Sequence, residues 1–389
     1  MKQLSLFKGP FHQSQGRSPL CVGGRPLAGI AVIALLSFFG MLTNEWALPV
    51  SANTAPTTSA PMVTQALSDT ATLTLSQQME LIRLGDAGVS LASFDAAPAS
   101  SLVAGTEMAP PSGYKSPQPA LQSPWGFFAS PTGTFGSIST GLPRQHANFY
   151  GFGLLGGADY QFSKALTAGF YAGYDHAKTE YASVLAGAED NVTRFGLFTA
   201  WQDQSHDWVD ASVGGAYHEL DNSVLSGVGG TSALGNAQGM ELDSTLQYGH
   251  DFRFGAWTLT PTAGLDYIRL AVDGYRTDST TSLNYGDQDS NSLRSKLGTT
   301  LSYAFKTGSV KWNPYLRGGW NHEFLDDVTE SPIIGTGIPN QPLGREAATF
   351  GVGVNAILSP TYSANFGYEG EADSYYQSYS LEASLHVVF

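Results

Sequence analysis

Alternation of apolar and polar residues in short runs is the feature that most constrains this chain, and it fills residues 124–389. Successive side chains of a β-strand point to opposite faces, so each run predicts a strand with one apolar and one polar face. Most runs are at least as long as the roughly 9–11 residues that a tilted strand needs to cross a membrane. We identify about twelve runs, at residues 125–130, 148–162, 165–177, 192–203, 208–220, 239–254, 257–272, 292–306, 310–324, 349–358, 362–371 and 377–389.

The polar rows of these runs carry full charges, which indicates where they point. In the run at 292–306, Leu293 and Leu297 alternate with Arg294 and Lys296. A cationic side chain that faces lipid at the membrane midplane costs about 2–4 kcal/mol, whereas the lumen of a membrane barrel is polar. We therefore predict a row of lumen-facing residues that includes Asp243, Arg253, Arg294, Lys296, Arg317, Glu369 and Glu382.

The run at 377–389 ends on an aromatic residue. Every second side chain forms an apolar row, and Ser380, Glu382 and Ser384 lie on the other face. A strand in a soluble β-sandwich can alternate in the same way. An aromatic terminal strand, however, resembles the signal by which bacterial outer-membrane barrels are recognised for assembly. The residues that we assign to this signal are Tyr379, Leu381, Leu385, Val387 and Phe389.

The connections between the runs alternate in expected length. Short turns are predicted at 163–164, 204–206, 255–256, 307–309 and 359–360. Long loops are predicted between them at 132–147, 178–191, 221–238, 273–291 and 325–348. Short turns on one side and long loops on the other are typical of outer-membrane barrels. The predicted fold is therefore all-β, an antiparallel transmembrane outer-membrane β-barrel of about twelve strands with a short N-terminal helix before it.

Composition agrees with this fold and argues against other classes. A formal net charge of -14 over 389 residues argues against nucleic-acid binding, which needs Lys and Arg. Charged residues make up 13% of the chain, against about 25% in soluble domains. The 45 Gly, 18 Tyr, 21 Phe and 7 Trp suit many short strands with aromatic girdles. We expect such girdles to include Trp125, Tyr160, Trp201, Trp208, Trp257 and Trp312.

The sequence of residues 1–52 predicts a signal peptide that directs export. Basic residues precede an uncharged apolar run at 27–42, and small residues stand before residue 53. A membrane anchor is the alternative, but the run is shorter than the roughly 20 residues that a spanning helix needs. The single cysteine, Cys21, precedes this run, so cleavage would leave a chain without thiols or disulfides.

The composition of residues 53–123 predicts a short linker or passenger segment that contains one helix. Residues 53–62 and 97–123 are rich in Ala, Ser, Thr and Pro, as in flexible segments. Residues 67–84 hold strong helix formers, and Gly85 is placed to end the helix. This segment leaves no room for a folded passenger domain of usual size. We therefore expect function to lie mostly in the barrel domain, residues 124–389.

Three segments resemble the autotransporter β-domain, the translocator of type V secretion in Gram-negative bacteria. They are GGADYQFSKALTAGFYAGYDHAKTEY at 156–181, WTLTPTAGLDYIRL at 257–270 and WNPYLRGGWNHEF at 312–324. The resemblance implies a monomeric barrel in outer-membrane lipid, assembled by the barrel assembly machinery with periplasmic chaperones. It also implies that a helix from residues 69–94 occupies the pore.

No motif in the sequence predicts catalysis, a cofactor or a metal site. Residues 151–156 (GFGLLG) match a dinucleotide-binding pattern, but they lie in a predicted strand that no helix follows. His218 and Glu219 are neighbours, and neighbours on a strand face opposite ways. The histidines lack the spacing of metal ligands, and acidic pairs such as Asp287 and Asp289 are typical of solvated loops. We therefore predict a protein that is not an enzyme and has no cofactor.

The sequence thus predicts an outer-membrane barrel that anchors its own short N-terminal segment or translocates it to the cell surface. Two alternatives stay open. The barrel could be a stand-alone porin or channel if its pore is not plugged, or a surface adhesin acting through the long loops, especially 325–348.

Overall fold

The computed structural model describes residues 60–86, 124–140, 145–181, 186–225, 232–276, 278, 284–325, 327–328, 345–374 and 376–389. The predicted signal peptide at 1–52 and the second flexible segment at 97–123 lie outside these described residues, as does most of the long loop at 325–348.

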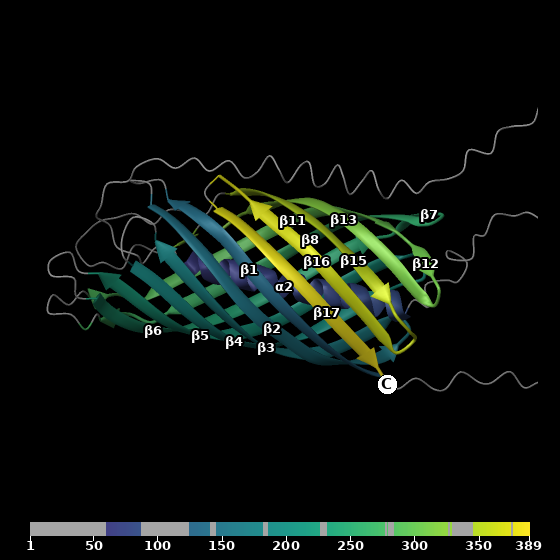
Figure 1. The fold of residues 1–389 in the computed structure, drawn as a ribbon, viewed down its shortest axis with the longest axis horizontal. Coiled ribbons are helices and arrows are strands. Elements are labelled where there is room, and N and C mark those ends of the chain that lie inside the picture. The colour runs from purple at the N-terminus through teal and green to yellow at the C-terminus, as the bar shows by residue number, and fades with distance from the viewer. Residues whose placement is uncertain are drawn as a thin grey trace, which may run out of the picture. The chain divides into compact units, whose positions relative to one another are not determined.

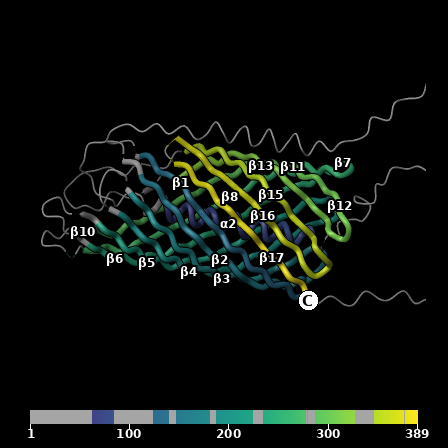
Figure 2. Tube along the Cα trace, viewed as in Figure 1, coloured from purple at the N-terminus to yellow at the C-terminus, as the bar shows by residue number. Residues whose placement is uncertain are grey.

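Twelve long strands form a closed antiparallel barrel, as the alternation predicted (Figures 1 and 2). Each strand pairs with its neighbour in the chain, and β1 pairs with β17 to close the wall. Closure removes the exposed edges that a sheet in lipid cannot tolerate. The strands are β1 (Trp125–Thr140), β2 (Gln145–Ser163), β3 (Leu166–Tyr181), β4 (Ala186–Gln202), β5 (Asp207–Leu225), β6 (Ser232–His250), β8 (Trp257–Val272), β11 (Gln288–Tyr303), β13 (Val310–Glu323), β15 (Glu346–Ile357), β16 (Tyr362–Ala372) and β17 (Tyr376–Val388).

Short strands complete the sheet at its ends. They are β7 (Phe252–Phe254), which pairs with β8, β12 (Phe305–Thr307), which pairs with β13, and β14 (Asp327–Val328), which pairs with β11. The hairpin of β9 (Tyr275–Arg276) and β10 (Asn284–Tyr285) forms a separate two-stranded sheet.

Several strands are longer than the sequence predicted, and they include many residues that were predicted to lie in loops. The predicted loop at 132–147 is mostly paired strand, and only residues 141–144 separate β1 from β2. In the same way, the predicted loops at 178–191 and 221–238 are mostly strand, and only residues 182–185 and 226–231 separate the strands there. Beyond the hydrocarbon layer a strand needs no apolar outer face, so the alternation fades while backbone pairing continues.

The predicted short turns form where backbone chemistry favours them. Gly255 and Gly308 adopt positive φ angles of 63° and 62°, and His206 adopts 73°. Positive φ costs a glycine little because it has no Cβ. These turns therefore join their strands tightly on one side of the barrel, which we call the short-turn end; the other side is the long-loop end.

The two faces of the wall differ as predicted for a membrane barrel. Large apolar side chains such as Phe152, Leu197 and Leu297 are exposed on the outer face. Among the aromatic residues expected in girdles, Trp125 and Tyr160 lie edge to face with ring centroids 5.0 Å apart. Trp208 was wrongly assigned to a girdle. It is 5% exposed and lies in the same inward row as Asp210, which is fully buried.

One α-helix precedes the barrel, α2 (Ala60–Asp86). It begins earlier than the predicted 67–84, inside the stretch predicted to be flexible, and it ends at Asp86, just beyond Gly85. No helix in the described part of the chain is long and apolar enough to cross a bilayer.

Candidate functional site

Helix α2 lies inside the barrel, along its length (Figure 1). Its backbone runs closest to β1–β4 and β15–β17. Side chains all around the helix are buried, both apolar ones such as Leu75 and Leu81 and polar ones such as Ser68 and Gln78. The lumen is therefore the site in which this protein brings distant parts of its sequence together.

An apolar stripe on α2 packs against bulky side chains of the early strands. Near the helix start, Val63 and Leu67 join a buried cluster with Ile138, Phe149 and Val192. Further along, a second cluster contains Leu75, Met79, Ile82, Phe128, Leu155, Tyr171, Phe198 and Ala200. The helical spacing of the stripe places it on one side of the helix. Apolar burial therefore attaches α2 to the β1–β5 side of the wall.

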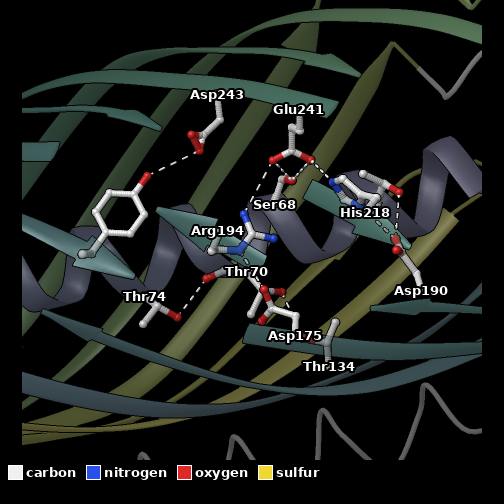
Figure 3. A network of polar contacts seen from close by, with 12 residues as sticks. Ser68, Thr70, Thr74, Thr134, Asp175, Asp190, Arg194, His218, Glu241 and Asp243 are labelled. Atoms are coloured by element: carbon white, nitrogen blue, oxygen red, sulfur yellow. Dashed lines mark hydrogen bonds and ion pairs between the residues drawn. The ribbon is translucent and has the colours of Figure 1, made fainter. Parts of the chain in front are cut away.

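A chain of polar contacts links the first half of α2 to β4 and β6 (Figure 3). The Ser68 hydroxyl lies 2.7 Å from both carboxylate oxygens of Glu241. His218 lies between that carboxylate, at 3.2 Å, and the carboxylate of Asp190, at 3.0 Å. The Thr64 hydroxyl donates to Asp190 over 3.3 Å. Each side chain in this series of contacts therefore has at least one partner that offsets part of the cost of its burial, although Oδ1 of Asp190 makes no hydrogen bond.

Arg194 supplies the positive charge for this cluster. Its guanidinium donates to Asp175 over 2.7 Å and lies 3.6 Å from Glu241. It is 2% exposed, so it needs such partners. Close by, the Tyr171 hydroxyl donates to Asp243 over 3.5 Å, which brings in one of the predicted lumen residues.

A second ionic cluster lies against the other side of α2. Arg294 donates to Asp69 of the helix over 2.9 Å and to Glu371 over 3.1 Å, and it also contacts Glu323 at 3.2 Å. Lys296 pairs with Asp266 and lies 3.7 Å from Asp69. Four strands and the helix thus meet at one layer of charge.

Near the helix end, a third cluster continues this pattern. Arg317 donates to Glu80 of α2 over 3.1 Å and to Glu369 over 3.3 Å. The Gln77 amide lies within hydrogen-bond distance of Glu369 and Glu382. One turn further, Arg83 pairs with Asp210 and lies over the ring of Trp208, 4.0 Å from its centroid. Ion pairs therefore hold the helix between Asp69 and Arg83.

These contacts fix the direction of α2. Thr64 contacts Asp190, which lies near the start of β4 and follows a long-loop connection. Arg83 contacts Asp210, which lies near the start of β5 and follows a short turn. The helix therefore begins towards the long-loop end and ends towards the short-turn end.

The predicted lumen residues lie in different surroundings. Arg294, Lys296, Arg317 and Glu369 take part in the ionic clusters that include helix side chains. Glu382 is 3% exposed and accepts from Ser384 over 2.9 Å. Arg253 lies apart, paired with Asp251 at 3.5 Å next to the short turn 255–256. The predicted assembly residues of β17 lie on its outer row, where Leu381, Leu385 and Phe389 are exposed.

The helix side of this site was not predicted from the sequence. Asp69, Glu80 and Arg83 recur at helical spacing on one face of α2, a pattern that indicates a partner for that face. Nor was the role of His218, whose partners Asp190 and Glu241 lie on the two adjacent strands, whereas the neighbouring Glu219 is exposed.

Comparison with known proteins agrees with this geometry. Residues 127–369 match the family model of the autotransporter β-domain. The chain belongs to this family. The fold matches the translocator domain of the autotransporter NalP from Neisseria meningitidis, with a TM-score of 0.58, 14% identity and coverage of 69% of this chain and 89% of that one. It also matches the β-domain of the Bordetella autotransporter BrkA, with a TM-score of 0.55, 18% identity and coverage of 68% and 99%.

Among curated relatives, the esterase EstA of Pseudomonas aeruginosa is 29% identical over 257 residues, which cover 60% of this chain. The chain spans only 38% of the length of that relative. Membership in the family implies a translocator barrel of type V secretion in the outer membrane, where barrels of this family are inserted by the barrel assembly machinery.

Proposed function

We propose that this barrel anchors α2 in its lumen and thereby holds the residues that precede the helix at the cell surface. The direction of α2 carries the proposal, because its first turns contact the long-loop end. In outer-membrane barrels the long loops face the outside of the cell and the short turns face the periplasm. Residues 53–59 would then leave the barrel on the outer side.

The packing of α2 supports anchoring over free passage through the pore. Asp69, Glu80 and Arg83 pair with charges on different parts of the wall. Breaking one buried ion pair costs about 3–5 kcal/mol. A helix held by several such pairs, and by two apolar clusters, would remain in the lumen after export.

Under this proposal, residues 1–52 are removed as a signal peptide, residues 53–123 are the displayed and anchoring segment, and residues 124–389 are the translocator. The barrel itself has no catalytic role in this proposal, so we do not propose the esterase activity named for EstA for this chain. We also propose that the barrel is monomeric, assembles with periplasmic chaperones, and is recognised through the outer row of β17.

An epitope tag inserted after Ala52 tests the proposal on intact cells. We expect antibody to label this tag, as it would label a tag in the connection 226–231 at the long-loop end. A tag at Lys164, in a short turn, is the matched control and should be labelled only after the outer membrane is opened. Protection of the Ala52 tag, with the 226–231 tag labelled, would contradict surface display.

A further inference from the structure

The lumen is divided into two unlike halves by α2. The β1–β5 side is filled by large side chains such as Phe128, Tyr171 and Phe198, which pack on the helix. The opposite side, lined by β6, β8, β11, β13 and β15, presents small groups between its charged side chains, including Thr260, Thr262, Gly264, Gly298, Thr300 and Gly319. Small side chains cannot reach the helix, so space remains on that side.

Two adjoining cavities occupy this space. The first has a volume of about 120 Å³ and reaches the short turn 255–256. The second has a volume of about 150 Å³ and lies further towards the long-loop end. Both are bordered by Ser76, Gln247, Thr262 and Arg317, so they meet along one face of the helix. A polar cavity needs about 10–15 Å³ for each water, so both have room for several waters.

A layer of charge borders the second cavity on its long-loop side. Asp69 of the helix and Glu371 of β16 line this cavity. Arg294 is 4% exposed and does not itself line the cavity, but it contacts both of these residues and Glu323 on β13. Asn321 also donates to Glu371, over 2.9 Å. A single guanidinium therefore connects the helix to the far wall.

We propose that the β6–β15 side of the lumen is a water-filled path for small inorganic cations, open at the short-turn end and sealed by Arg294. Without the guanidinium, the carboxylates of Asp69, Glu323 and Glu371 would line the opening. Rings of carboxylates favour cations in channels. The inference rests on the packing of α2 in the lumen and is independent of where residues 53–59 lie.

Single-channel recording of the intact purified barrel in planar bilayers with KCl tests the proposal. The native barrel should pass little current. Arg294→Ala should raise the conductance by about five-fold or more, and the reversal potential in a KCl gradient should show preference for K⁺. The barrel that lacks residues 53–123 sets the upper limit of the conductance.

Arg194→Ala is the matched control. Arg194 is similarly buried and also joins carboxylates of two strands, but its partners Asp175 and Glu241 line neither cavity. The partners of Arg294 on the helix and on β16, in contrast, line the second cavity. Its removal should leave the conductance near the native value. An equal rise in both variants would mean that α2 loosens, and it would overturn the proposal.

Folding is checked by heat-modifiable mobility on gels. If Arg294→Ala does not fold, Arg294→Gln provides the same comparison because it removes the charge and keeps hydrogen-bonding groups. A folded Arg294 variant with native conductance, beside a highly conducting barrel without residues 53–123, would also overturn the proposal.

Discussion

Barrels that carry Leu297→Arg are expected to be far less stable than the native barrel. Leu297 is 50% exposed on the outer face, near the middle of β11. A cationic side chain on the lipid face at the midplane costs about 2–4 kcal/mol. Since about 1.4 kcal/mol corresponds to a factor of ten, the folding equilibrium should fall by roughly thirty-fold or more. Urea unfolding in lipid vesicles measures this loss.

The adjacent residue provides a control for this prediction. Lys296 pairs with Asp266 and faces the lumen, so Lys296→Arg keeps a cation among its partners and should change stability little. Two arginines at neighbouring positions should therefore have very different effects. Equal stability of the two variants would contradict the assignment of the inner and outer faces of β11.

Deletion of Phe389 is expected to lower the amount of folded barrel in the outer membrane several-fold. The backbone N–H of Phe389 donates to Trp125 over 3.2 Å, and its ring lies edge to face with Phe127, with centroids 5.6 Å apart. These contacts join the ends of β1 and β17, where the barrel closes. The ring is 63% exposed on the outer row proposed to be recognised during assembly.

Heat-modifiable folded protein in the outer-membrane fraction measures this loss. Phe389→Trp is the control, because it keeps an aromatic ring at the interface, where tryptophan is favoured. Its folded yield should stay near native. Equal yields from the deletion and the native chain would exclude an assembly role for Phe389.

The part of each strand that crosses the membrane could be predicted because lipid and lumen demand opposite side chains. For β8, the structure has the predicted bounds, Trp257–Val272. The extension of β1 from residue 130 to Thr140 could not be predicted. Pro131 interrupts the pattern and lacks an N–H to donate. In the structure, however, the pairing of β1 with β17 resumes at Thr132.

The lumen contacts were less predictable, because alternation gives the face of a residue and not its partner. Arg294 was correctly expected to be charged and inward-facing from its place between Leu293 and Ser295, and the structure buries it. Its partners Asp69 and Glu371 are separated from it by 225 and 77 residues. Such pairs depend on strand register and on the depth of the helix, which no local pattern encodes. The face of Trp208 could have been predicted, because it shares a row with Asp210; only its partner Arg83, on the helix, could not.

A disulfide between Thr70→Cys and Thr134→Cys tests most directly whether α2 lies inside the barrel. The two hydroxyl oxygens are 3.1 Å apart, with Thr70 on the helix and Thr134 on the inner face of β1. The sequence has one native cysteine, Cys21, in the predicted signal peptide. Peptide mass spectrometry of the oxidised barrel should find the 70–134 link. A control pair, Thr70→Cys with Thr258→Cys near the short-turn end, should give none. Failure to form the 70–134 link in folded barrels, or equal linkage in the control, would contradict the position of α2.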